Sequence, residues 1–233
     1  MKPKLRDYIL SEFLLLLILG ATGSVLWAGR GVLRTALGDF ALLGFVLLFL
    51  LLYGGFTSAV LGLFAKAFPL RDGDYTTDDT PFTLWKVTHV VEELGKISLS
   101  IFFPVFFRPA FYALFGATVG KGVAVSCKIL DPRLTILEDG CVLGEGCVLT
   151  SHALSRGRFI IGRIRVGRNA IIGIGTMVMP GVSVGVGAVI LPGSVLTRNT
   201  VVPPGETWGG VPAVRVKPAP TPIEAPATGG VSF

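Results

Sequence analysis

Two long apolar stretches open the chain. Tyr8–Trp27 is mostly Leu, Ile, Val and Phe with one early acid, Glu12, and Phe40–Ala65 contains no charged residue. As a helix, the second stretch would be about 39 Å long at 1.5 Å per residue, which exceeds a hydrocarbon core of about 30 Å. We therefore expect two membrane-spanning helices joined by a turn at Ala28–Asp39. A cleaved signal peptide is the alternative for the first stretch, but the second stretch follows at once and favours the hairpin.

The next segment mixes polar and aromatic residues. Residues 71–83 carry several aspartates and predict a polar surface loop. Residues 84–115 are rich in phenylalanine but are broken by Pro104 and by Arg108–Pro109. The uninterrupted apolar run, Ile97–Phe107, is too short for a third span. An interfacial or re-entrant pair of amphipathic helices in the headgroup region fits this pattern.

From Gly116 onwards an aliphatic residue recurs at every sixth position. These positions are Val166, Ile172, Val178, Val184, Ile190, Leu196 and Val202, and in the same phase towards the N-terminus Ile160, Leu154, Val148, Val142 and Ile136. Val119 and Val125 are one residue out of phase, so we expect an irregular turn near Asp131–Pro132. A period of six over this distance predicts a solenoid in which each unit forms one short strand and one tight corner.

The sequence thus divides into four parts. We expect a transmembrane hairpin (1–70), a polar loop with interfacial helices (71–115), a parallel β-helix (116–213) and a flexible C-terminal tail (214–233) rich in Pro, Ala, Thr and Gly. Three units would close one coil of the β-helix, and its aliphatic side chains would point inwards.

Composition and charge indicate where in the cell the protein is located. The chain is 51% apolar and only 15% charged, so some apolar surface has to face lipid or a partner subunit. The net charge of +6 is scattered and forms no basic patch for nucleic acid. Lys2, Lys4 and Arg6 precede the first apolar stretch, and Lys66 and Arg71 follow the second. The turn between the two stretches carries Arg30 and Arg34, so the positive-inside rule gives only a modest bias towards a cytoplasmic location of both ends. We expect an integral protein of a bacterial inner membrane with its β-helix in the cytoplasm.

Two segments of the repeat region carry recognisable motifs. Ile164–Ala213 closes with Gly-Val-Pro-Ala, and Ile136–Gly167 contains a Gly-Glu-Gly step followed by Thr-x-His at Thr150–His152. The first segment resembles the C-terminal coils of the hexapeptide-repeat acyltransferases. The second resembles more closely the membrane-embedded terminal domains of polylysine-synthetase-type nonribosomal peptide synthetases. The resemblance implies a left-handed β-helix, a homotrimer with active sites between neighbouring solenoids, and acyl-CoA as co-substrate, with no covalently bound cofactor.

The same resemblance implies roles for individual residues. His152 would be the general base that deprotonates the acceptor, a task that suits a histidine's ordinary pKa of about 6.5. The residues placed along the coenzyme A groove are Gly173, Gly175, Thr176 and Gly193, with Arg215 and Lys217 as partners of its phosphates. Glu145 or Glu138 is the candidate acid that would orient the histidine.

The expected function is transfer of an acyl group, with acetyl preferred, to a hydroxyl or amine acceptor of the cell envelope. The alternative is a non-catalytic trimeric membrane scaffold or accessory subunit of an envelope complex. Zinc enzymes with this repeat need three histidines per metal, whereas this chain has only His152 in the solenoid and His89 outside it, so no metal is expected. His89 is interpreted as an ordinary solvated or interfacial group. Cys141 and Cys147 are expected on different faces as reduced core thiols, which argues against nucleophilic roles.

Overall fold

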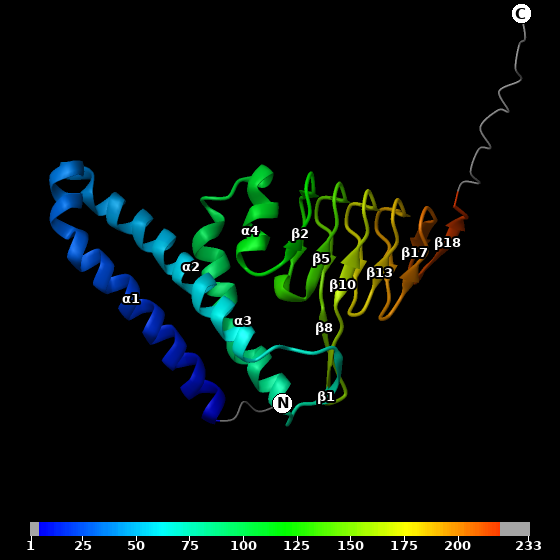
Figure 1. Ribbon diagram of the computed structural model, residues 1–233, viewed down its shortest axis with the longest axis horizontal. Helices are drawn as coiled ribbons and strands as arrows, with labels where there is room; N and C mark the ends of the chain where they lie inside the picture. Colours follow the sequence, from blue (N-terminus) through cyan, green and yellow to red (C-terminus); the bar gives the residue numbers. More distant parts are fainter. Residues whose placement is uncertain (1–4, 220–233) are drawn as a thin grey trace, which may run out of the picture.

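A helical hairpin forms the N-terminal part of the molecule. The structure, a computed structural model, describes residues 5–219. Helix α1 (Leu5–Leu37) and helix α2 (Ala41–Ala67) run antiparallel and are joined by a 3-10 turn, η1 (Gly38–Phe40) (Figure 1). The continuous helical run Leu5–Ala67 contains an 18-residue window with a mean hydropathy of 2.3, none of which is buried by the rest of the chain. This run is long and apolar enough to cross a membrane.

The turn of this hairpin is shorter than the sequence predicts. The expected turn at Ala28–Asp39 is wrong, because α1 continues to Leu37 and only η1 separates the two helices. Gly38 adopts a φ of 52°, a left-handed conformation that glycine reaches without strain, and this permits the abrupt reversal. The segment before it contains no proline that would end the helix earlier.

Helix α3 (Thr80–Ser100) packs closely against α2. A Cβ atom added at Gly54 of α2 would lie 2.2 Å from the Cγ of Leu99, and one added at Gly95 of α3 would lie 2.4 Å from the Cγ2 of Thr57. Small residues therefore allow the two helix backbones to approach one another. The predicted polar loop at 71–83 is wrong in part, because it contains strand β1 (Gly73–Thr76) and the first turn of α3.

A short helix covers the first coil of the solenoid. After η2 (Val105–Phe107), helix α4 (Arg108–Leu114) buries Phe111 and Tyr112 against the first strands. The Tyr112 hydroxyl donates to the carbonyl of Cys127 at 2.9 Å and accepts from the N–H of Ile129 at 3.2 Å. The segment 71–115 thus contains the expected pair of helices, and both pack on other parts of the protein.

Residues 116–217 form a parallel β-solenoid with three faces (Figure 1). The five-stranded face contains β2 (Thr118–Val119), β5 (Thr135–Leu137), β10 (Ile164–Val166), β13 (Ser183–Val184) and β16 (Val201–Val202). The six-stranded face contains β3 (Ala124–Val125), β6 (Val142–Leu143), β11 (Ile171–Ile172), β14 (Val189–Ile190), β17 (Thr207–Gly210) and β18 (Ala213–Lys217). The four-stranded face contains β4 (Lys128–Ile129), β7 (Val148–Leu149), β12 (Met177–Val178) and β15 (Val195–Leu196).

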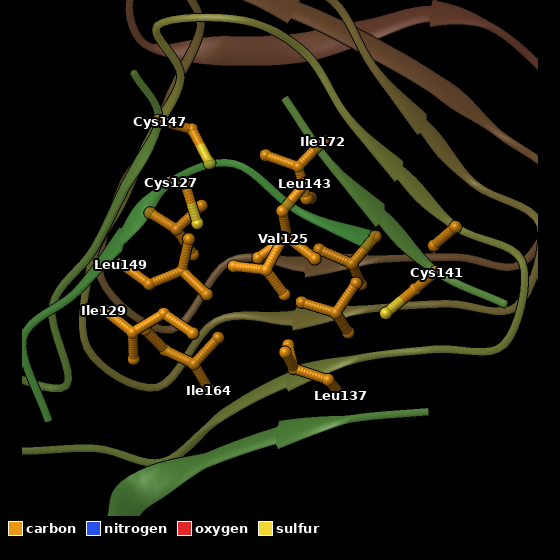
Figure 2. Close-up of a cluster of buried hydrophobic side chains, with 14 of the residues drawn as sticks. Val125, Cys127, Ile129, Leu137, Cys141, Leu143, Cys147, Leu149, Ile164 and Ile172 are labelled. Carbon is orange, nitrogen blue, oxygen red and sulfur yellow. The ribbon is translucent and has the colours of Figure 1, made fainter. Parts of the chain in front are cut away.

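The interior of the solenoid confirms the six-residue period in the later coils. The predicted inward residues of these coils, Val166, Ile172, Val178, Val184, Ile190, Leu196 and Val202, are all buried. Buried small residues such as Ala170 and Ala188 lie two positions before an inward aliphatic residue. Cys127, Cys141 and Cys147 take the same place in the first two coils, and Figure 2 shows them among the core side chains. Cys141 and Cys147 precede strands of different faces, as expected.

The phase predicted for the early coils is wrong. Ile136, Val142, Val148, Leu154 and Ile160 are not buried, and the inward residues are instead Leu137, Leu143 and Leu149 (Figure 2). Val119 pairs in register with Leu137, so the earliest strands share this phase. The phase changes between Leu149 and Val166, where β8 (His152–Ser155) and β9 (Arg158–Ile161) leave the coil as a hairpin. The expected irregular turn near Asp131–Pro132 is present as the 3-10 turn η3 (Pro132–Leu134), but the phase changes one coil later. Strand β9 also pairs antiparallel with β1, which ties the segment before α3 to the β8–β9 hairpin.

The C-terminal boundary of the solenoid differs from the expected one. Strand β18 pairs antiparallel with β17, so the ordered domain continues to Lys217 rather than ending at residue 213. Residues 220–233, the rest of the predicted tail, lie outside the described residues.

Candidate active site at the His152 corner

His152 lies at the edge between the four-stranded and five-stranded faces. We call the loops along this edge the His152 corner; they comprise residues 130–134, 150–163, 179–182 and 197–200 of successive coils. In the second coil the loop is expanded into the β8–β9 hairpin, which Figure 1 shows extending from the coils towards β1. The base of the hairpin is closed by Gly162, whose N–H donates to the carbonyl of Ser151 at 2.9 Å. His152 is therefore the first residue of an insertion and does not occupy a core slot of the repeat.

Asp131 of the preceding coil contacts His152 directly. Its Oδ2 lies 2.7 Å from Nδ1 of His152 and accepts from the N–H of Ser151 at 2.9 Å. The other carboxylate oxygen, Oδ1, accepts from Nε1 of Trp85 in α3 at 3.0 Å. Stacking of adjacent coils brings the acid and the histidine together, although they are separated in sequence. The hydroxyl of Thr150, the first residue of the Thr-x-His motif, donates to the carbonyl of His152 at 2.7 Å and fixes the turn.

The electrostatics of this pair favour an ionised acid. Burial acts to raise the pKa of Asp131, but hydrogen bonds from His152 and Trp85 outweigh it and hold that pKa below its usual value. An ionised Asp131 accepts a hydrogen bond from Nδ1–H of His152, which leaves the lone pair on Nε2 free. Burial lowers the pKa of the nearby His89, whose ring centroid lies 5.7 Å from that of His152, so His89 stays neutral at physiological pH.

Helix α3 covers the pair. The ring of Trp85 lies 4.3 Å from the ring of His152 between centroids and also stacks on His89 at 4.8 Å. Arg133 holds the helix in place by donating to the hydroxyl of Thr88 at 2.9 Å and by pairing with the buried Glu92 at 3.5 Å. The side chain of His152 retains 16% exposure and that of Asp131 retains 5%. A partly exposed histidine above a buried acid has the arrangement of a general base with its orienting carboxylate.

The residues predicted for the coenzyme A groove lie on a different edge. Gly173, Gly175, Thr176 and Gly193 belong to the loops between the six-stranded and four-stranded faces. We call this edge the Gly175 corner; it comprises residues 126–127, 144–147, 173–176 and 191–194. Gly175 and Gly193 have φ of 64° and 67° with open space on the side of a Cβ. Gly173 lies against Pro192, and Thr176 is buried with its hydroxyl donating to the carbonyl of Leu191 at 3.3 Å. The four-stranded face separates these residues from His152.

The predicted phosphate partners and the predicted orienting acids lie elsewhere. Arg215 of β18 pairs with Glu206 at 3.4 Å, and Lys217 ends the same strand. Glu138 pairs with Arg165 at 3.1 Å on the corner between the five-stranded and six-stranded faces, and Glu145 is exposed on the Gly175 corner. Neither acid orients His152. The nomination of Glu138 or Glu145 is wrong, because Asp131 takes that place.

The sequence missed Asp131, Trp85 and His89 as neighbours of His152. A signal for Asp131 was present, since the Asp131–Pro132 step marks an irregular corner of the coil that precedes the Thr-x-His motif. No comparable signal marks Trp85 and His89, because their position depends on how α3 packs on the solenoid. They are also one helical turn apart, at i and i+4, and so lie on one face of α3.

Other chemistry finds little support among the described residues. Burial raises the pKa of the Cys141 thiol to about 11, and a hydrogen bond with Cys147 together with burial raises the pKa of Cys127. These thiols are therefore poor nucleophiles. Within residues 5–219, no group of three or more His, Cys, Asp or Glu side chains is placed to hold a metal ion.

Comparison with known proteins adds structural neighbours. No protein-family model and no curated protein matches the chain. A maltose O-acetyltransferase from Clostridium difficile 630 aligns with 18% identity and a TM-score of 0.47 over 65% of this chain and 95% of its own. A hexapeptide-repeat acetyltransferase from Vibrio cholerae O1 biovar eltor, complexed with acetyl coenzyme A, aligns with 18% identity and a TM-score of 0.46 over 54% and 84%. A galactoside acetyltransferase in complex with coenzyme A aligns with 20% identity and a TM-score of 0.38 over 48% and 70%. At these identities and TM-scores, the reaction has to be argued from the residues of this chain.

Proposed function

We propose that the chain is a membrane-anchored acyltransferase that moves an acyl group, with acetyl preferred, from acyl-CoA to a hydroxyl or amine acceptor. The observation that carries this proposal is the 2.7 Å contact between Nδ1 of His152 and the buried carboxylate of Asp131. A buried carboxylate hydrogen-bonded to Nδ1 orients an imidazole for proton transfer at Nε2, which is the arrangement of a general base with its orienting acid. The kinship with polylysine-synthetase-type terminal domains is part of the proposal and rests on the match at Thr150–His152.

The mechanism follows from the orientation of the imidazole. Asp131 accepts a hydrogen bond from Nδ1–H, and Nε2 of His152 removes the proton from the acceptor hydroxyl or amine. The acceptor's lone pair forms a bond to the thioester carbonyl carbon, the carbon–sulfur bond breaks, and coenzyme A leaves as a thiolate. The imidazolium returns its proton to that thiolate, so the products are the acylated acceptor and free coenzyme A. No covalent enzyme intermediate is needed.

The assembly belongs to the same proposal. We assign the solenoid a left-handed coil and a homotrimeric arrangement, with α1 and α2 in the bilayer of a bacterial inner membrane and the solenoid in the cytoplasm. The exposed apolar surface of the hairpin supports contact with lipid. A cytoplasmic solenoid would meet acyl-CoA where it is made. The membrane anchor favours an acceptor that is itself held at the membrane.

The scaffold alternative has one observation in its favour. With only 16% of its side chain exposed, His152 is enclosed by Trp85, Asp131 and Phe159. In the scaffold, the only role of His152 would be to hold the β8–β9 hairpin against α3. That function would leave the protein without affinity for coenzyme A.

One experiment separates the two functions. Calorimetry measures coenzyme A and acetyl-CoA binding to the purified full chain in detergent, and a thiol assay follows release of free coenzyme A from acetyl-CoA. We expect binding by the wild type and His152→Ala alike, with slow release of coenzyme A only by the wild type. The matched control His89→Ala removes a neighbouring imidazole and should retain release. Absence of binding in all three proteins would overturn the acyltransferase and leave the scaffold.

A further inference from the structure

The first coil of the solenoid is incomplete at the Gly175 corner. Only Ser126 and Cys127 separate β3 from β4, whereas residues 144–147 separate β6 from β7 in the next coil. In the later coils, the corner amide of Gly175 donates to the carbonyl of Glu145 at 3.0 Å, and that of Gly193 donates to Ile174 at 2.8 Å. The first coil has no corresponding carbonyl for Gly146. Within residues 5–219, the N–H of Gly146 has no hydrogen-bond partner.

The missing corner residues leave a pocket between the solenoid and the helices. Its volume is about 350 Å³, and its walls come from the end of α3, the start of α4, β4 and the Glu145–Gly146 corner. Two cations line it, Arg108 of α4 and Lys128 of β4, and neither forms an ion pair with any residue in the described part of the chain. Glu145 is the acid at the rim, so the pocket keeps a net positive charge. The hydroxyl groups of Ser126 and Tyr112 also line it.

Apolar side chains project beside the cations. Phe106 is 90% exposed and Phe107 is 58% exposed, and both lie in η2, immediately before Arg108. Phe103 and Phe111 line the inner wall of the pocket. Exposed aromatic residues next to unpaired cations suit the boundary between lipid headgroups and acyl chains.

We propose that this pocket binds the phosphate of a membrane lipid headgroup. Arg108 and Lys128 neutralise the phosphate, the N–H of Gly146 donates a hydrogen bond to it, and the η2 phenylalanines contact the acyl chains. Phosphate could also come from soluble coenzyme A, but a soluble ligand gives no reason for Phe106 to be exposed beside the pocket. The site rests on the proposed membrane anchoring and does not depend on the chemistry of His152.

The pocket and the His152 corner are joined by one strand. Strand β4 contains Lys128 and is followed by Leu130 and Asp131, so the two sites are roughly 10 Å apart at ~3.3 Å per extended residue. Helix α3 also connects the two sites, because its last residue, Ser100, lines the pocket and His89 lies beside His152. A lipid held by its phosphate would have its headgroup within reach of the Asp131–His152 pair.

Binding of tail-labelled phosphatidylglycerol to the full chain in detergent tests the proposal by fluorescence anisotropy, with tail-labelled diacylglycerol as the phosphate-free probe. We expect Arg108→Gln with Lys128→Gln to weaken phosphatidylglycerol binding by roughly tenfold or more, because two charge-assisted hydrogen bonds are lost. Diacylglycerol should bind weakly to both proteins. The control, Lys121→Gln with Arg168→Gln, removes the same charge from exposed residues of another corner and should bind the lipid as the wild type does.

Three outcomes would overturn the proposal: unchanged lipid binding by the double variant, equal loss in the control, or displacement of the lipid by coenzyme A accompanied by loss of coenzyme A affinity in the double variant. The third outcome would make the pocket a coenzyme phosphate site. His152→Ala should keep lipid affinity while losing release of coenzyme A, so failure of the lipid site and failure of the acyltransferase are distinguishable.

Discussion

The His152 corner and the Gly175 corner begin from the same repeat and depart from it in opposite ways. At the His152 corner, residues 150–163 replace the short loop found in later coils, and the insertion carries a histidine out of the core. At the Gly175 corner, the first coil is shortened to Ser126 and Cys127, and the deletion leaves a charged pocket. Trp85 of α3 covers the first place, and Phe103, in the segment after α3, lines the second. A uniform solenoid thus obtains side chains for chemistry by insertion and space for a ligand by deletion.

The largest expected effect comes from removing the charge at the His152 corner. Asp131→Asn should lower release of coenzyme A from acetyl-CoA by about 10²–10⁴-fold, because the imidazole loses the carboxylate that fixes its tautomer and stabilises its protonated form. The thiol assay measures this rate. Glu138→Gln removes an acid from a different corner and should leave the rate unchanged. Equal losses in both variants would contradict the role given to Asp131.

Thiol reactivity gives the next effect and concerns the buried thiols of the first two coils. Cys127, Cys141 and Cys147 are buried, and burial raises the pKa of Cys141 to about 11, so very little of the Cys141 thiol is thiolate at pH 8. Alkylation of the folded protein should be slower than that of the unfolded protein by at least about a hundredfold. Mass spectrometry of modified peptides gives the rate for each cysteine. Fast labelling of Cys127 or Cys147 in the folded protein would mean that the pocket reaches into the core.

A smaller effect tests how α3 is held over the His152 corner. Gly54→Leu should destabilise the protein by about 1–3 kcal/mol, because the new side chain would overlap Leu99 of α3. Gly55→Leu is the matched control, since a Cβ at Gly55 meets no atom within 4 Å. Thermal unfolding in detergent compares the two variants. Similar melting temperatures would show that α3 does not depend on this close contact.

The smallest effect is the pH dependence of stability at the same corner. The pKa of Asp131 is lowered in the folded protein, so its ionised form contributes stability above the ordinary aspartate value of about 3.9, and this contribution is lost as pH falls through the folded pKa. The difference in unfolding free energy between the wild type and Asp131→Asn should therefore shrink as the medium is acidified below that value. Denaturant titrations at neutral and acidic pH measure it. A difference that grows with acidification would contradict the ionised state.

The sequence predicted the inward positions that follow from the six-residue repeat, and it missed the contacts that form only when adjacent coils stack. The later inward positions, such as Val166 and Val178, follow directly from a six-residue repeat and are confirmed. The phase of the later coils could not be extended to the early coils, because the β8–β9 hairpin after Thr150 changes the phase of the repeat. Asp131 was missed as a partner because its contact with His152 exists only once adjacent coils are stacked.

The position of helix α3 on the solenoid could not be predicted from the sequence either. The sequence places helix α3 at the lipid interface and predicts an ordinary solvated or interfacial position for His89. In the structure α3 packs closely on α2 at Gly54 and Gly95, and Trp85 contacts Asp131 of the solenoid. No local sequence pattern predicts the contact between Trp85 and Asp131.

The rate of coenzyme A release tests the central claim, that His152 oriented by Asp131 is the general base. Release from acetyl-CoA by the full chain should be lost in His152→Ala, while binding of coenzyme A measured by calorimetry is kept. His89→Ala should keep the release rate. A release rate that is unchanged in His152→Ala, or that is lost with His89 instead, would contradict the account.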